Sequence, residues 1–259
     1  MILRKKGIHQ PEYASNVKGV AKDMTEREQA KRPDTGPRFT EEDPLCLRWI
    51  GEQGSAQFGQ VQRLLARLSP NPEKLAAPRM LSIQRTRKRL ARWRKEGFIE
   101  FRTFLASEKG WVWLSKRGLE YSGLGDMRYY EPKLESLRHL YWVNQARLYI
   151  EQQRPDDAWK SERIIRYEQP ALPAGKKAPH IPDALLIKAN GDAIAIEVEL
   201  SSKKRERVQA ILRELSASYY RTWYFVAQPA WATVEAALAQ LPDRQRKNIQ
   251  MLSVEEKLK

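Results

Sequence analysis

Two apolar segments with an Asn-Gly pair between them lie in the second half of the chain. Residues 181–187 read Ile-Pro-Asp-Ala-Leu-Leu-Ile, and residues 193–200 read Ala-Ile-Ala-Ile-Glu-Val-Glu-Leu. Short apolar runs on both sides of Asn190-Gly191 are typical of a β-hairpin with a two-residue turn. The sequence therefore predicts two paired strands, over residues 181–188 and 193–200. Any fold of this chain has to contain these two paired strands.

The predicted hairpin carries three acidic residues, Asp183, Glu197 and Glu199. Because side chains alternate between the two faces of a strand, Glu197 and Glu199 are expected on one face, beside Asp183 on the partner strand. Carboxylates placed together repel one another unless a cation lies between them, and oxygen ligands suit Mg²⁺ or Mn²⁺. We therefore predict that these three residues bind such a metal and are catalytic. The alternative is that the glutamates lie in solvent, paired with nearby basic residues.

Further catalytic candidates flank the hairpin. Lys203 and Lys204 follow the second strand, where a lysine can stabilise developing negative charge or orient an attacking water. Glu162 lies in a strand predicted over residues 159–168 and is the candidate for a fourth acid. The alternative for Glu162 is an ordinary surface position.

The hairpin belongs to a region, residues 129–259, in which helical and strand patterns alternate. A helix is expected before it over residues 134–153. The segments expected after it are a helix over 204–220, a strand over 222–227, a helix over 231–241 and a strand over 248–254. This order predicts an α/β core with a mixed central sheet and helices on its faces.

The preceding region, residues 43–128, contains three predicted helices, the third beginning after Ser82, with Ile83, Leu90 and Trp93 turned inward. Two strands, over residues 98–102 and 111–114, and a short helix follow. Three helices before a β-hairpin is the order of a winged helix-turn-helix domain. The third helix and the hairpin turn supply the residues predicted to contact double-stranded DNA: Arg85, Arg87, Lys88, Arg89, Arg92 and Lys109. The alternative is a solvated basic helix face.

Composition agrees with a polyanionic partner, since the net charge is +15 and the isoelectric point is about 9.9. A single cysteine, Cys46, excludes an internal disulfide and a multi-cysteine zinc site. No apolar run is long enough for a membrane span, and a cytoplasmic location is expected. Residues 1–42 have little hydrophobic periodicity and are predicted to be a basic tail.

The acidic pattern resembles the motif of the PD-(D/E)xK nuclease superfamily. Pro182-Asp183 corresponds to its first part and Glu197-Val198-Glu199 to its second, with Glu199 standing where the usual motif has lysine. Some restriction endonucleases of the superfamily also have Glu-x-Glu. The resemblance implies an α+β protein in which a winged helix-turn-helix domain precedes a restriction-endonuclease-like core.

With the helix that carries His139 and Val143-Asn144, residues 44–227 also resemble the replication-relaxation proteins and the MOBC class of plasmid relaxases. That resemblance implies a bacterial enzyme that nicks one strand at a transfer origin, with a mobilization or coupling protein as a further partner. It implies metal binding by the three acids and makes Lys203 the candidate catalytic lysine. Since the three histidines are far apart in the sequence, we expect no stable tyrosyl adduct of the kind that His-cluster relaxases form.

Two other functions remain open from the sequence. One is a metal-dependent endonuclease of a restriction or transposition system, which would share this site. The other is a DNA-binding accessory protein with an inactive core.

Overall fold

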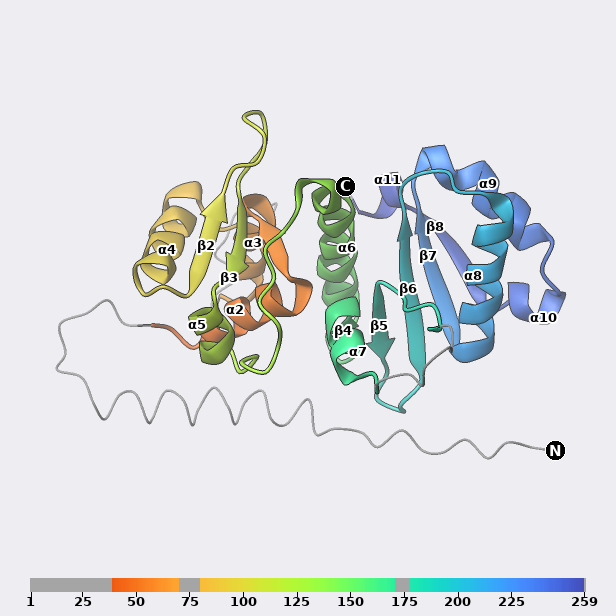
Figure 1. The fold of residues 1–259 in the computed structure, drawn as a ribbon, viewed down its shortest axis with the longest axis horizontal. Coiled ribbons are helices and arrows are strands. Elements are labelled where there is room, and N and C mark those ends of the chain that lie inside the picture. Colours follow the sequence, from red (N-terminus) through yellow and green to blue (C-terminus); the bar gives the residue numbers. More distant parts are fainter. Residues whose placement is uncertain (1–38, 70–79, 171–177, 259) are drawn as a thin grey trace. The chain divides into compact units, whose positions relative to one another are not determined.

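The computed structural model describes residues 39–69, 80–170 and 178–258. The first part of this structure has helices on both sides of a small antiparallel sheet of order β1-β3-β2 (Figure 1). Its helices are α2 (Glu42–Gln53), α3 (Phe58–Arg67), α4 (Ile83–Lys95) and α5 (Lys116–Tyr121). Its strands are β1 (Ser55–Gln57), β2 (Ile99–Arg102) and β3 (Trp111–Leu114).

The predicted helices and the predicted hairpin of this part are confirmed, with three differences. Strand β1 was not predicted, because three residues are too few to show an alternating pattern. The sequence predicts that the first helix ends near Gly51 and Gly54; α2 passes through Gly51 and ends at Gln53, directly before Gly54. A Cβ at Gly51 would lie 2.7 Å from Leu114 and 2.6 Å from Leu124, so the glycine allows close packing. Ile83 was expected inside and is 52% exposed.

The second part contains a five-stranded sheet of order β4-β5-β6-β7-β8. Strands β4, β5 and β6 pair antiparallel, whereas β6, β7 and β8 pair parallel, so the sheet is mixed as predicted. The strands are β4 (Ala158–Ser161), β5 (Ala184–Ile187), β6 (Ala193–Glu199), β7 (Arg221–Val226) and β8 (Ile249–Ser253). The helices are α6 (Leu134–Gln153), α7 (Glu162–Glu168), α8 (Arg205–Ser218), α9 (Gln228–Ala239), α10 (Asp243–Arg246) and α11 (Val254–Lys257).

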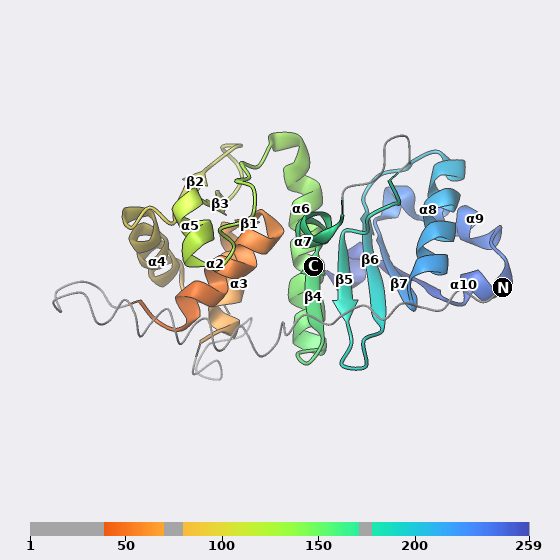
Figure 2. The same ribbon diagram turned by 60° about the horizontal axis from the view of Figure 1, so that its bottom comes forward.

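Both faces of the five-stranded sheet are covered by helices (Figure 1, Figure 2). On one face, Ile196 and Val198 of β6 pack against α6 and α11. On the other, Ala195 of β6 and Tyr224 of β7 pack against α8 and α9. Since neighbours in a strand point to opposite faces, Glu197 and Glu199 lie on the α8 side. The fold is therefore an α+β arrangement with a mixed, doubly covered sheet.

Two local predictions in this part are wrong. The turn between β5 and β6 is longer than two residues, because the Lys188 N–H donates to the Asp192 carbonyl and the loop is Ala189-Asn190-Gly191. Gly191 adopts φ of 84°, which is the left-handed conformation that such a three-residue loop requires. The strand predicted over residues 159–168 ends at Ser161, whose side chain accepts from the Ile164 N–H and caps α7. Glu162 therefore begins a helix.

A buried polar network joins the two parts of the described structure. Asn144 of α6 accepts from the Gln53 amide at 2.8 Å and donates to the Ser55 carbonyl at 2.9 Å. Arg147 of α6 pairs with Glu52 of α2 at 2.8 Å. The compact unit that begins at Glu42 contains both parts, and the boundary predicted near residue 128 lies within it.

The tail predicted over residues 1–42 falls almost entirely outside the described residues. Among the helices that are described, none has the length and apolar character needed to cross a membrane.

Candidate functional site

The three predicted metal ligands lie at one edge of the five-stranded sheet. Asp183 immediately precedes β5, and Glu197 and Glu199 end β6. The antiparallel register pairs Ala184 with Ile196, which puts Asp183 next to Glu197 across the two strands. The hairpin thus brings together residues that are distant in sequence.

Asp183 is fixed by hydrogen bonds from two directions. One carboxylate oxygen accepts from the Val198 backbone N–H at 2.8 Å, and the other lies 2.8 Å from Nε2 of His139 on α6. Desolvation lowers the pKa of His139, but Asp183, Glu197 and Glu162 raise it to a net value of about 9. His139 is therefore a cation at neutral pH that offsets the negative charge of the site.

Glu197 is buried, with 8% of the residue exposed. Burial and the charge of Asp183 raise its pKa to about 7, although His180 and Lys203 act in the opposite direction. His180 Nε2 lies 2.5 Å from a Glu197 oxygen, and this hydrogen bond raises the pKa of His180. His180 lies in the loop before β5, and its backbone N–H donates to Glu214 of α8. His139 and His180 therefore both contact acids of the site.

Lys203 and Glu199 form an ion pair of 2.6 Å, with Glu199 buried and Lys203 half-exposed. The charge of Lys203 also reaches Glu197 and lowers its pKa. Lys204 comes directly before α8, and no contact links it to these acids among the described residues. The geometry therefore favours Lys203 as the lysine of the site.

Glu162 lies at the start of α7 and pairs with Arg166 of the next turn. Its carboxylate is 41% exposed, and its electrostatic effect on the site is to raise the pKa of His139. Glu162 is therefore peripheral to the pair formed by Asp183 and Glu197.

Basic side chains contact the carboxylates of the site. Within residues 39–69, 80–170 and 178–258, no three His, Cys, Asp or Glu side chains converge as a ready metal site. Instead, each of the three carboxylates contacts a basic group: His139, His180 and Lys203 respectively. Buried carboxylate oxygens on adjacent strands are ligands of the kind that Mg²⁺ and Mn²⁺ prefer. The chemistry of Asp183 and Glu197 fits such an ion if it replaces the side chains of His139 and His180.

The basic residues of α4 fall into two groups. Arg92 pairs with Asp43 at 2.6 Å, and Arg89 lies 3.4 Å from the same aspartate, which is fully buried at the start of α2. Trp93 also donates to Asp43 at 2.8 Å. These contacts attach α4 to α2 and leave 21% of the Arg89 side chain and 17% of the Arg92 side chain exposed.

The other predicted DNA-binding residues are exposed on α4 and on the loop between β2 and β3. They are Arg85, Arg87, Lys88 and Lys109. Arg94 and Lys95 on the same helix are also exposed and extend this surface. The positive charge is thus presented by one helix and one hairpin.

Searches with protein-family models, among curated proteins and among solved structures found no match to this chain.

Proposed function

We propose that the protein is a Mg²⁺- or Mn²⁺-dependent DNA endonuclease that cuts one strand of a duplex. The observation that carries the proposal is the pairing of Asp183 and Glu197 on adjacent strands. They are so close that the charge of one raises the pKa of the other. A fold gains no stability from two carboxylates brought together beneath a helix, which favours a catalytic role.

In this proposal Asp183 and Glu197 hold the ion, and Glu199 positions Lys203 through their ion pair. A bound Mg²⁺ or Mn²⁺ supplies an activated water and neutralises charge on the scissile phosphate. Lys203 contributes a second positive charge beside the ligands, where negative charge develops during phosphodiester hydrolysis. In the absence of metal, the positive charge of His139 offsets part of the negative charge of the carboxylates.

The arrangement of α2, α3, α4 and the β2–β3 hairpin supports a winged helix-turn-helix domain, with α4 as the recognition helix and the hairpin as the wing. The five-stranded sheet, with its acids at one edge, supports a PD-(D/E)xK core. Arg85 and Lys88, exposed on α4, are then the phosphate or base contacts to duplex DNA. The polar network through Asn144 and Arg147 holds the two parts together and sets the distance between the recognition helix and the cleavage site.

The resemblance of the motifs extends the proposal to a relaxase of a mobile genetic element, acting in the bacterial cytoplasm with a mobilization or coupling protein. Asp183 and Glu197 are common to this enzyme and to a nuclease of a restriction or transposition system. The two differ in the product, since a relaxase leaves a nick.

A supercoiled plasmid that carries the candidate transfer origin tests the proposal. With Mg²⁺ or Mn²⁺ the wild-type protein is expected to convert it to open circles, and EDTA is expected to stop the reaction. Linear product would contradict the relaxase and indicate a double-strand endonuclease. Duplex binding without cleavage in any metal would contradict the nuclease and leave a DNA-binding accessory protein.

A further inference from the structure

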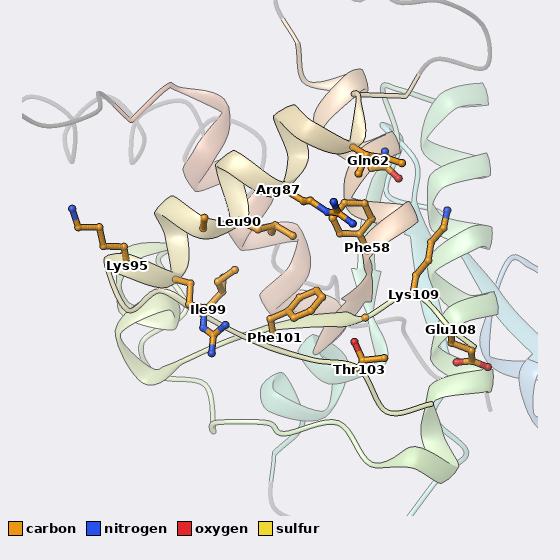
Figure 3. A pocket seen from close by; sticks show the side chains of 14 residues that line it. Phe58, Gln62, Arg87, Leu90, Lys95, Ile99, Phe101, Thr103, Glu108 and Lys109 are labelled. Atoms are coloured by element: carbon orange, nitrogen blue, oxygen red, sulfur yellow. The ribbon is translucent and has the colours of Figure 1, made fainter. Parts of the chain in front are cut away.

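A groove of about 770 Å³ lies between α4 and the β2–β3 hairpin (Figure 3). Its apolar lining includes Leu90, Ile99 and two phenylalanines, Phe58 and Phe101. Figure 3 shows both aromatic side chains directed into the space between the helix and the hairpin. Both phenylalanines are half-buried, so each keeps part of its ring open to a ligand.

The backbone around the groove holds the two rings in place. The Phe58 N–H donates to the Gly110 carbonyl at 2.8 Å, which attaches the start of α3 to the hairpin. The Phe101 ring lies directly over Gly110, where a Cβ would come within 2.1 Å of the ring. A glycine is therefore required at position 110 for this ring position.

The groove is also positively charged. Arg87, Arg94, Lys95 and Lys109 line it, against the single carboxylate of Glu108. Within the described part of the chain, Arg87, Arg94 and Lys109 are engaged in no ion pair, in contrast to Arg89 and Arg92 on the opposite side of α4. This charge pattern complements a phosphate backbone.

We propose that this groove binds unpaired nucleotides of single-stranded DNA. An aromatic ring in a groove stacks with a base that has left the duplex, and arginine or lysine beside it holds the adjoining phosphates. The volume falls within the range of about 300–1,000 Å³ that is usual for small-molecule sites. The proposal rests on the DNA-binding half of the proposed function and adds a substrate class, DNA with a locally opened strand.

Two surfaces of α4 then bind different forms of DNA. Arg85 and Lys88 do not line the groove and face solvent, where they can contact a duplex. Arg87 and Arg94 line the groove with the phenylalanines. A protein built in this way holds a duplex and an adjoining single strand at the same time.

Fluorescence anisotropy with labelled oligonucleotides tests the inference, with single-stranded and duplex DNA of the same sequence, in EDTA so that cleavage plays no part. Phe101→Leu keeps an apolar side chain and removes the aromatic face. It is expected to weaken single-strand binding about tenfold and duplex binding less than about twofold. Arg87→Gln, at an exposed position that does not threaten folding, is expected to change binding in the same direction.

The matched control is Lys88→Gln, which removes one charge from the outer face of the same helix. It is expected to weaken duplex binding more than single-strand binding. Equal losses on the two DNA forms in the Phe101 and Arg87 variants would overturn the inference. Unchanged single-strand binding in both variants, or a wild-type protein that binds only duplex, would overturn it as well. Failure of the nuclease proposal appears in the plasmid assay instead, so the two are distinguishable.

Discussion

Asp183→Asn and Glu197→Gln are each expected to lower plasmid cleavage by about a thousandfold or more, since each variant replaces a charged metal ligand with a neutral amide. The substitutions keep the shape of the side chain. In the Asp183→Asn variant the amide oxygen can still accept from the Val198 N–H, so the hairpin is expected to stay folded. The measurement is the initial rate of open-circle formation in Mg²⁺ or Mn²⁺.

The control for these variants is Glu235→Gln, which neutralises an exposed carboxylate on α9 away from the site. It is expected to cut at the wild-type rate. All three variants are expected to bind duplex DNA with wild-type affinity, because α4 is unchanged. Cleavage that persists within about tenfold of wild type in Asp183→Asn or Glu197→Gln would show that the paired acids are not the metal ligands.

Arg147→Ala is expected to cost about 3 kcal/mol of the free energy of unfolding, because it removes the buried guanidinium that Glu52 and Glu151 share. Each glutamate keeps one more exposed arginine, Arg48 on Glu52 and Arg67 on Glu151. The Arg147 side chain is 7% exposed and pairs with Glu52 and Glu151 at 2.8 and 2.7 Å. It also donates to Gln53 at 3.2 Å, and the guanidinium lies 4.7 Å from the centre of the Trp49 ring. Urea unfolding followed by tryptophan fluorescence measures the effect.

A matched surface pair supplies the comparison for Arg147. Arg246 and Asp243 form an ion pair with 46% and 78% of their side chains exposed. Arg246→Ala is therefore expected to cost less than about 1 kcal/mol, since water and salt screen exposed pairs. Similar costs for the two alanine variants would mean that the interface network does not hold the two parts of the protein together.

Long periodic elements could be predicted from the sequence. Helix α6 has the bounds that its apolar spacing indicated, and β5 and β6 pair as the hairpin pattern indicated. The apolar patterns of these elements extend over many residues, because burial on one or both faces requires apolar side chains at regular positions. The hairpin pattern predicted the pairing of β5 with β6, but the register that places Glu197 opposite Asp183 depends on the three-residue loop, because a two-residue turn would place Val198 there.

Tertiary contacts were beyond the reach of the sequence. His139 and His180 reach Asp183 and Glu197 through packing of α6 and of the loop before β5, so neither spacing nor composition indicated them. Arg92 was predicted to contact DNA. Its ion pair with Asp43 could not be predicted from the sequence, because Asp43 lies in another helix.

The local error at Glu162 has a different cause. A short apolar segment at residues 164 and 165 fits a strand as well as a helix, and the cap supplied by Ser161 decides the outcome. Serine followed by an acidic residue at a helix start was the signal available in the sequence.

The most direct test of the central claim is to count bound Mn²⁺ by electron paramagnetic resonance of the purified protein, at about pH 8 so that Glu197, with a pKa of about 7, is ionised. The wild-type protein is expected to bind Mn²⁺ specifically, and this binding is expected to be lost in the Glu197→Gln variant and displaced by excess Mg²⁺. Wild-type protein that binds no Mn²⁺ with or without DNA, or a Glu197→Gln variant that binds it equally well, would show that these acids do not form a metal site.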